Sequence, residues 1–512
     1  MGNDFSQTQD LISRGLAGFI PELVLSALVC VLLLADLFIR GVKPRTTAWI
    51  ATIGLVLAGA TLWPRLAASG EIFGWMQGGT QQGLLVTDRF AWFFQMFCLA
   101  TALATLPMAL DHAAFRARRM GEYHALVVAA TLGMFMMAGA VNLLIAWLGI
   151  EFASMASYLA TAFDKRDRRG SEGGIKYVIY GSVASGVMLY GLSLIYGMTG
   201  SLHYGAIAQQ LQVSGASDLG LMTAALLVFG GFAYKMAAFP MHFWCPDVYE
   251  GAPTPFTAYL SVASKAAGFA VFVRFIAAFT TGEGPSFVAF GSVPFDASFG
   301  WPTLIAAAAA LSMTVGNLAA LWQTNVKRML AWSSVAQAGY LLMAVAVYAA
   351  GRGRPSGGDL GPLIFYFIAY FFMNLGAFHV VTVIASRTGA QHVEDFNGLG
   401  RRAPWMAFGL TVCLLSLLGV PPTGGFTGKL QLLQTAVENH LVWLAVLAGI
   451  NTAISAFYYF KLIRCMYLHE NQAGLVTTGT TNAVLLALLV LPVLVLGLAF
   501  SPFIELSRSF GF

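Results

Sequence analysis

The sequence predicts an all-α polytopic membrane protein. Of its 512 residues, 58% are hydrophobic and only 10% are charged, and the mean hydropathy is +0.73. Such a composition excludes an ordinary soluble globular protein. Apolar stretches of about 20 residues, the length that crosses the hydrocarbon core of a bilayer, recur along the whole chain. Because the connections between them are too short for a soluble domain, we expect residues 1–512 to form a single membrane domain.

Hydropathy and helix-breaking residues predict about 14 transmembrane helices. The predicted spans cover residues 17–39, 46–65, 88–110, 122–140, 142–163, 171–199, 219–243, 254–280, 301–322, 325–350, 361–386, 404–437, 441–467 and 482–506.

The basic residues predict how these spans are oriented. Lys and Arg favour the short loops on the cytoplasmic side of a membrane. If both termini lie on the outer, periplasmic side, most of the 28 Lys and Arg fall near the inner side. These inner residues are Arg40, Lys43, Arg45, Arg116, Arg118, Arg119, Lys165, Arg166, Arg168, Arg169, Lys327, Arg328, Arg387, Arg401, Arg402, Lys461 and Arg464. We therefore expect a multi-pass protein of a bacterial plasma membrane with both termini outside, with a thylakoid membrane as the alternative.

Two spans contain Pro/Gly interruptions beside a lysine. Pro240 follows Lys235 in the seventh span, and the run PPTGG precedes Lys429 in the twelfth. Proline removes a backbone donor, and such breaks persist in a membrane where they are buried in protein or line water. Two similar breaks five spans apart predict two five-helix repeats, the usual plan of secondary transporters. Two ordinary proline kinks are the alternative.

Five charged residues lie within apolar spans: Glu151, Lys176, Lys235, Lys265 and Lys429. An ionised side chain at the bilayer centre costs roughly 2.5–3.5 kcal/mol on insertion scales, so we expect these groups to pair, to face protein or to line water. One acid and four bases predict a proton relay, because an ammonium group has no acceptor to offer a metal ion. A structural carboxylate at Glu151, and a Lys176 side chain that reaches the interface, are the simpler alternatives.

His242 and His379 are weaker candidates for the relay, since a single histidine in an apolar span is more often structural. The five cysteines include no CxxC pair, and GGFTGKL lacks the first glycine and the final Ser/Thr of a phosphate-binding loop. We therefore expect this chain to bind no metal and no cofactor. The net charge of +5 comes from short loops, so we expect no nucleic-acid partner either.

The run KMAAFPMHFWCPDVYEGAPTPFTAYLSVASKAAGF at 235–269 strongly resembles the antiporter-like membrane subunits of complex I, the NADH-quinone oxidoreductases. Further supporting runs lie at 326–340, 371–381 and 414–430, and the resemblance covers nearly the whole chain. It implies two inverted five-helix repeats, spans 4–8 and 9–13, with broken helices 7 and 12. The implied divisions are a three-helix segment at 17–110, repeats at 122–280 and 301–467, and a C-terminal helix at 482–506.

The resemblance also implies roles for individual residues. The family's buried glutamate matches Glu151, and its lysines match Lys176, Lys235, Lys265 and Lys429. Lysine at the last of these positions, where sister subunits carry glutamate, favours the N-type branch of the family. Where sister subunits often carry a relay histidine in span 10, this chain has glutamine.

The function implied is proton translocation driven by quinone reduction in other subunits. NADH, FMN, iron–sulfur clusters and a quinone would be bound by those subunits, and the partners of this chain would be other membrane subunits, the lipid bilayer and protons. A subunit of a multisubunit cation/proton antiporter is the main alternative; a hydrogenase subunit and a structural spacer are two more.

Overall fold

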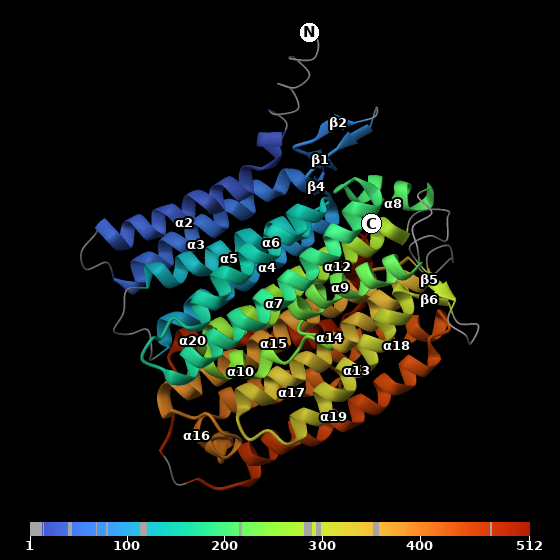
Figure 1. The fold of residues 1–512 in the computed structure, drawn as a ribbon. Helices are drawn as coiled ribbons and strands as arrows, with labels where there is room; N and C mark the ends of the chain where they lie inside the picture. Colours follow the sequence, from blue (N-terminus) through green and yellow to red (C-terminus); the bar gives the residue numbers. More distant parts are fainter. Residues whose placement is uncertain are drawn as a thin grey trace.

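The computed structural model describes residues 13, 15–38, 43–67, 69–77, 80–112, 120–213, 218–280, 289–292, 298–351, 358–471 and 474–511. Four of the predicted inner-loop residues, Arg40, Arg116, Arg118 and Arg119, lie outside these ranges. The helices run side by side along a common direction, with α2 and α3 at one side of the array and α19 at the other (Figure 1).

Within the described residues, 13 helical segments are long and apolar enough to cross a membrane, which confirms the all-α membrane fold. They are formed by α2 (Ile20–Phe38), α3 (Pro44–Leu62) with η1 (Trp63–Leu66), α4 (Arg89–Asp111), α5 (Gly121–Gly139), α6 (Leu143–Thr161), α7 (Arg168–Thr199), α9 (Asp218–Met236), α11 (Thr254–Tyr259) continuing through η3 (Leu260–Ser264) into α12 (Lys265–Thr280), α13 (Trp301–Leu321), α14 (Val326–Gly351), α15 (Gly361–Thr388), α19 (Val442–Leu468) and α20 (Thr480–Leu498).

The remaining predicted span, 404–437, consists of two shorter helices, α17 (Pro404–Leu418) and α18 (Gly424–Glu438). The seventh span is likewise interrupted, because α9 ends at Met236 and Ala237 has a φ of +55°. A short helix, α10 (Trp244–Gly251), follows this break. Both predicted interruptions are therefore present. The inverted relationship of the two repeats, and the division of the chain into them, stay predictions.

The structure corrects two boundaries. The seventh helix stops at Met236, before residue 243, because a positive φ cannot continue an α-helix. The last predicted span, 482–506, divides into α20 and a separate helix, α21 (Ser501–Arg508), which opens with a proline in its first turn. Proline suits a helix start because it has no backbone N–H to donate.

The connections contain small elements that the sequence did not predict. The antiparallel strand pairs are β1 (Gly70–Ile72) with β4 (Leu85–Thr87), β2 (Trp75–Gln77) with β3 (Thr80–Gln82), and β5 (Ala289–Ser292) with β6 (Ser298–Gly300). The short helices are α8 (Tyr204–Val213), η4 (Val393–Phe396) and α16 (Leu399–Arg402).

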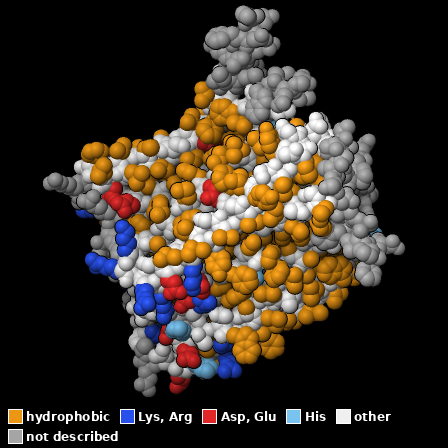
Figure 2. Space-filling view, in the orientation of Figure 1, with side chains coloured by type: hydrophobic (Ala, Val, Ile, Leu, Met, Phe, Trp, Pro, Cys, Tyr) orange, Lys and Arg blue, Asp and Glu red, His pale blue; other side chains and the backbone are white. Residues whose placement is uncertain are grey.

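Burial divides the helices into a central and an outer group. In the most apolar 18-residue stretch of the α11–α12 span, 100% of the residues are buried. In the corresponding stretch of α14, 94% of the residues are buried. The corresponding share is only 39% in α2, α3, α7 and α19 and 33% in α20. The outer helices expose apolar side chains, and Figure 2 shows such side chains across most of the visible face. A face of this kind suits contact with lipid or with other membrane subunits.

Charged side chains gather at one end of the bundle, which we call the basic end. At this end Arg169 bonds to Gln391 and Lys327 to the Ala252 carbonyl. Figure 2 shows Lys, Arg, Asp and Glu gathered along one edge. At the other end, the ring of Phe510, just after α21, stacks on Trp92 at the start of α4 at 5.7 Å, and Trp92 in turn contacts Trp63 in η1. The ion pair between Arg65 in η1 and Glu22 brings the start of α2 to this same end. The described parts of both termini therefore lie at the same end, as an even number of spans requires.

Candidate functional site

Lys235 lies on the last turn of α9, directly before the first break. Its Nζ donates a 3.0 Å hydrogen bond to Ser154 Oγ on α6, and the residue is only 2% exposed. Glu151 lies one helical turn earlier on α6, is partly exposed and acts electrostatically on Lys235. Among the described residues the two form no ion pair within 4 Å. Lys235 is thus held by a neutral hydroxyl, with a carboxylate nearby rather than in contact.

The stem of Lys235 packs against Gly268 on α12. A Cβ atom at Gly268 would lie 3.2 Å from Lys235 Cγ, so a larger side chain would press on the lysine. Gly268 is one turn beyond Lys265 on the same helix. Lys235 therefore touches the backbone of α12 one turn away from Lys265.

Lys265 begins α12 directly after the π-helical turn η3. Its ammonium group donates a hydrogen bond to the backbone carbonyl of Ser334 on α14, and the residue is 2% exposed. The Ser334 hydroxyl in turn lies 3.0 Å from the Tyr370 hydroxyl. π-Helical turns are frequent at functional sites, and here the turn lies immediately before the buried lysine.

Lys429 lies on α18, after the second break. Its Nζ donates hydrogen bonds to the carbonyl oxygens of Leu417 (2.9 Å) and Leu418 (3.1 Å), the last residues of α17. It also lies 4.3 Å from the centre of the Tyr340 ring. The interruption leaves these carbonyls without helical partners, and the carboxyl end of a helix favours a cation. The Pro/Gly break therefore creates the site that receives the ammonium group.

Gln337 on α14 shares a hydrogen-bond acceptor with Lys429. Its Nε2 donates a 3.0 Å hydrogen bond to the Leu417 carbonyl, which also accepts from Lys429. Its Oε1 accepts a hydrogen bond from Tyr366. Because Gln337 lies one turn after Ser334, a single face of α14 contacts both Lys265 and the Leu417–Lys429 pair.

Lys176 lies apart from these three lysines, at the basic end of the bundle. Its Nζ is 2.7 Å from Asp247 and 2.8 Å from Glu172, and its side chain is 38% exposed. Arg328 also bonds to Asp247, at 2.5 Å, and to Glu250, at 2.8 Å. Burial raises the pKa of Asp247, but hydrogen bonds from Lys176 and Arg328 outweigh it and hold that pKa below its usual value.

The two candidate histidines lie in different surroundings. His242 is fully buried in the first break, its ring stacks on Phe243 at 4.3 Å, and neither ring nitrogen has a hydrogen-bond partner among the described residues. His379 on α15 bonds through Nε2 to the carbonyl of Asn482 at the start of α20, at 3.0 Å. That contact joins two helices and suits a structural histidine. Buried, unpartnered nitrogens such as those of His242 suit bound water.

A small polar cavity opens at the basic end of the bundle. It has a volume of about 260 Å³, and its lining includes His112, Asp164, Asp167 and Lys327. Burial, with Lys327 nearby, lowers the pKa of His112 to about 4, so the imidazole is neutral at pH 7. Within the described residues, no three His, Cys, Asp or Glu side chains gather as a metal site would require.

Several contacts of the site were not predicted. Ser154 lies three residues after Glu151, and Ser334 lies three before Gln337, so helical spacing could have indicated both. The acceptors of Lys429 are backbone carbonyls, so no side-chain type in the sequence could have indicated them. The buried ion pair between Arg65 and Glu22, at 2.5 Å, was also missed, because the two residues are far apart in the sequence.

The sequence is similar to known membrane proteins over most of its length. Residues 140–455 match the family described as NADH:quinone oxidoreductase/Mrp antiporter, TM. The chain is 39% identical to NADH-quinone oxidoreductase subunit N 2 of Chloroherpeton thalassium, over 98% of this chain and 96% of that protein. It is 40% identical to NADH-quinone oxidoreductase subunit N of an Anaeromyxobacter species, over 97% and 96% of the two chains.

Two solved structures share the fold. A chain of respiratory complex I from Thermus thermophilus is 28% identical, with a TM-score of 0.77, over 96% of this chain and 100% of that one. A chain of the archaeal membrane-bound sulfane sulfur reductase is 23% identical, with a TM-score of 0.83, over 97% and 96% of the two chains.

Proposed function

Because the chain belongs to the NADH:quinone oxidoreductase/Mrp antiporter membrane family, we propose that it is a proton-translocating subunit of a complex I-type NADH-quinone oxidoreductase. Its partners would be the other membrane subunits of that assembly. NADH, FMN, iron–sulfur clusters and quinone would be bound elsewhere in the complex. The chain would lie in a bacterial plasma membrane with its basic end toward the cytoplasm, following the positive-inside rule.

The observation that carries the proposal is the environment of Lys235, Lys265 and Lys429. In the described part of the chain, their ammonium groups donate only to hydroxyl or carbonyl oxygens and form no ion pair with a carboxylate. All three are at most 5% exposed. A buried lysine without a charged partner favours its neutral form, so small changes in its surroundings change its proton affinity. A structural role would be served as well by an apolar side chain.

The proposed route follows the contacts in order. A rearrangement driven by the redox reaction would change the distance between Glu151 and Lys235, and the proton affinity of Lys235 with it. The proton released would pass by water to Lys265, which lies one turn from Gly268, the residue that packs on the stem of Lys235. It would then follow the α14 face, past Gln337, to Lys429. The amide of Gln337 does not ionise between pH 4 and 10, so this last stretch would depend on water.

Assembly provides the first test. The tagged chain is extracted gently from native membranes and separated by native electrophoresis with an NADH-oxidation stain. We expect it to migrate with a large band that oxidises NADH and contains flavin and iron–sulfur clusters. Migration in an assembly without redox activity would contradict the proposal, and sodium/proton exchange would then test the antiporter alternative.

A further inference from the structure

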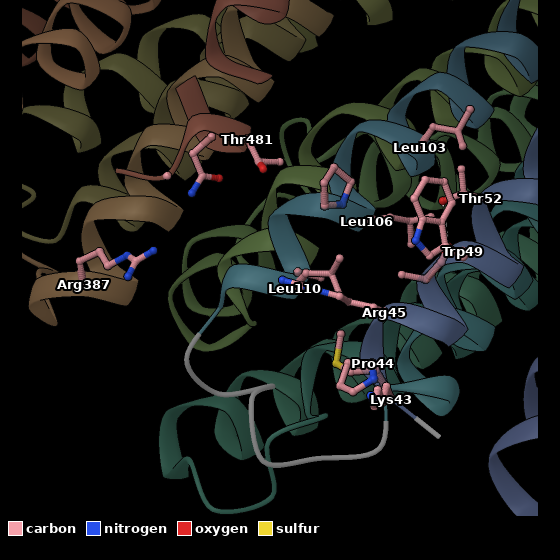
Figure 3. A pocket seen from close by; sticks show the side chains of 16 residues that line it. Lys43, Pro44, Arg45, Trp49, Thr52, Leu103, Leu106, Leu110, Arg387 and Thr481 are labelled. Atoms are coloured by element: carbon pink, nitrogen blue, oxygen red, sulfur yellow. Dashed lines mark hydrogen bonds between the residues drawn. The ribbon is translucent and has the colours of Figure 1, made fainter. Parts of the chain in front are cut away.

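A large cavity at the basic end of the bundle lies apart from the buried lysines. It has a volume of about 1050 Å³ and lies between α3, α4 and the start of α20. This volume is at the upper end of the range of small-molecule sites, about 300–1,000 Å³. Figure 3 shows Lys43 and Arg45 below Leu106 and Trp49, with Leu110 beside Arg45 and with Arg387 on the opposite side of the cavity.

Three cations line this cavity, two on one side and one on the other. Lys43 and Arg45 lie at the start of α3, and Arg387 lies at the end of α15. All three are exposed, and none forms an ion pair or a side-chain hydrogen bond with another described residue. No Asp or Glu is among the residues that line the cavity. Three positive charges from two distant segments therefore face one space, with no carboxylate paired to them among the described residues.

The part of the wall formed by α3 and α4 is mainly apolar and follows both helices along their length. From Pro44 to Thr52 the rise along α3 is about 12 Å, and from Leu110 to Leu103 along α4 it is about 10 Å. Half of the hydrocarbon core is about 15 Å thick. Trp49, 66% exposed, forms part of this wall. A ligand that fills the cavity needs an anionic group at the interface and an apolar part that extends about 10–12 Å into the hydrocarbon.

We propose that this cavity is a binding site for an anionic phospholipid, with its phosphate between Arg45, Lys43 and Arg387 and an acyl chain along α3 and α4. Arginine pairs with phosphate through two parallel hydrogen bonds, which a zwitterionic headgroup accepts less favourably because its own ammonium group competes. The lipid would join the N-terminal helices to α15 and α20. This site neither includes a relay lysine nor requires the relay to exist.

The test uses the whole purified complex. It is reconstituted in nanodiscs of phosphatidylcholine with equal phosphatidylglycerol, re-extracted in mild detergent and analysed for bound lipid by native mass spectrometry. We expect phosphatidylglycerol to be retained selectively by the unmodified complex. The double variant Arg45→Gln/Arg387→Gln should retain it roughly 30-fold less, since each cation near a membrane surface contributes about a factor of five toward an anionic lipid. The matched control Arg166→Gln/Arg168→Gln removes two exposed inner-side cations outside the cavity and should change nothing.

A second variant, Leu103→Trp, keeps the charges and fills the apolar wall. Loss of bound lipid in this variant supports a lipid site, whereas unchanged lipid retention with competition by inorganic phosphate would show a site for phosphate alone and overturn the proposal. Equal retention of both lipids by the unmodified complex and the double variant would overturn it as well. NADH oxidation by each variant, measured alongside, reports that the complex has assembled.

Discussion

The ammonium group of Lys429 lies 2.9 Å from the carbonyl oxygen of Leu417, at the carboxyl end of α17. The helix ends there because Gly419 adopts a φ of +91°, and the following residues through Thr423 form the break. The carbonyl oxygens of this last helical turn have no partner within the helix, so they offer hydrogen bonds and partial negative charge without a carboxylate. A cation held in this way stays stabilised while remaining able to lose its proton to water.

Gly419→Ala should destabilise the protein and disturb Lys429. An L-residue at this φ costs about 1–2 kcal/mol, and an added Cβ would lie 3.1 Å from Lys429 Cδ. Thermal unfolding of the purified complex measures the loss. Gly449→Ala is the matched control, because that glycine lies inside α19 with open space around it and should tolerate alanine. Equal behaviour of the two variants would contradict the role given to the break.

Gln337→Leu should lower the proton-to-electron ratio. It removes the side chain that bonds to the Leu417 carbonyl and to Tyr366, and it places an apolar group between Lys265 and Lys429. Gln337→His, which can carry a proton itself, should retain pumping. The ratio is measured with the complex in proteoliposomes, with the exposed Gln434→Leu as control. If leucine at position 337 pumped as well as glutamine, the route would have to bypass α14.

Ser154→Ala should lower the pumping rate roughly fivefold, since a hydrogen bond to a charged group contributes about 1.5–3 kcal/mol and part of this is recovered by water. The variant removes the described acceptor of Lys235. Ser157→Ala is the control, because the hydroxyl of this buried serine bonds only within α6, to Ala153. A serine-to-alanine change that acts equally at both positions would indicate a packing effect.

The sequence predicts the helices better than their partners. Hydropathy identifies each span because a helix that crosses a membrane must be apolar over about 20 consecutive residues. The prolines indicate where two of the spans are interrupted. Lys176 shows the limit, since two helices, α8 and α9, lie between it and its partner Asp247 in the sequence, and no periodicity places the two together. The acceptors of Lys265 and Lys429 are backbone carbonyls, which every residue has. Their contact with a lysine is decided by packing alone.

His112 should make stability depend on pH. Its pKa is lowered to about 4, below an unfolded value near 6.5, so the folded state favours the neutral ring. The contribution of His112 to the free energy of unfolding is then complete above pH 6.5. It falls by up to about 3 kcal/mol as the pH drops toward 4. His112→Gln should flatten this part of the profile in thermal unfolding between pH 7 and 4. His469→Gln, at an exposed position, should leave it unchanged. A profile that is identical in all three proteins would contradict the assignment.

The most direct test of the proton relay is the proton-to-electron ratio of the complex with Lys235→Ala, measured in proteoliposomes as proton uptake per NADH oxidised. The account predicts a lower ratio and a rate of NADH oxidation at least about tenfold lower, because proton transfer by a positioned group typically contributes 10²- to 10⁴-fold. Lys461→Ala, which removes an exposed lysine at the basic end, should pump normally. If Lys235→Ala left both the ratio and the oxidation rate unchanged, the relay through Lys235 would be contradicted.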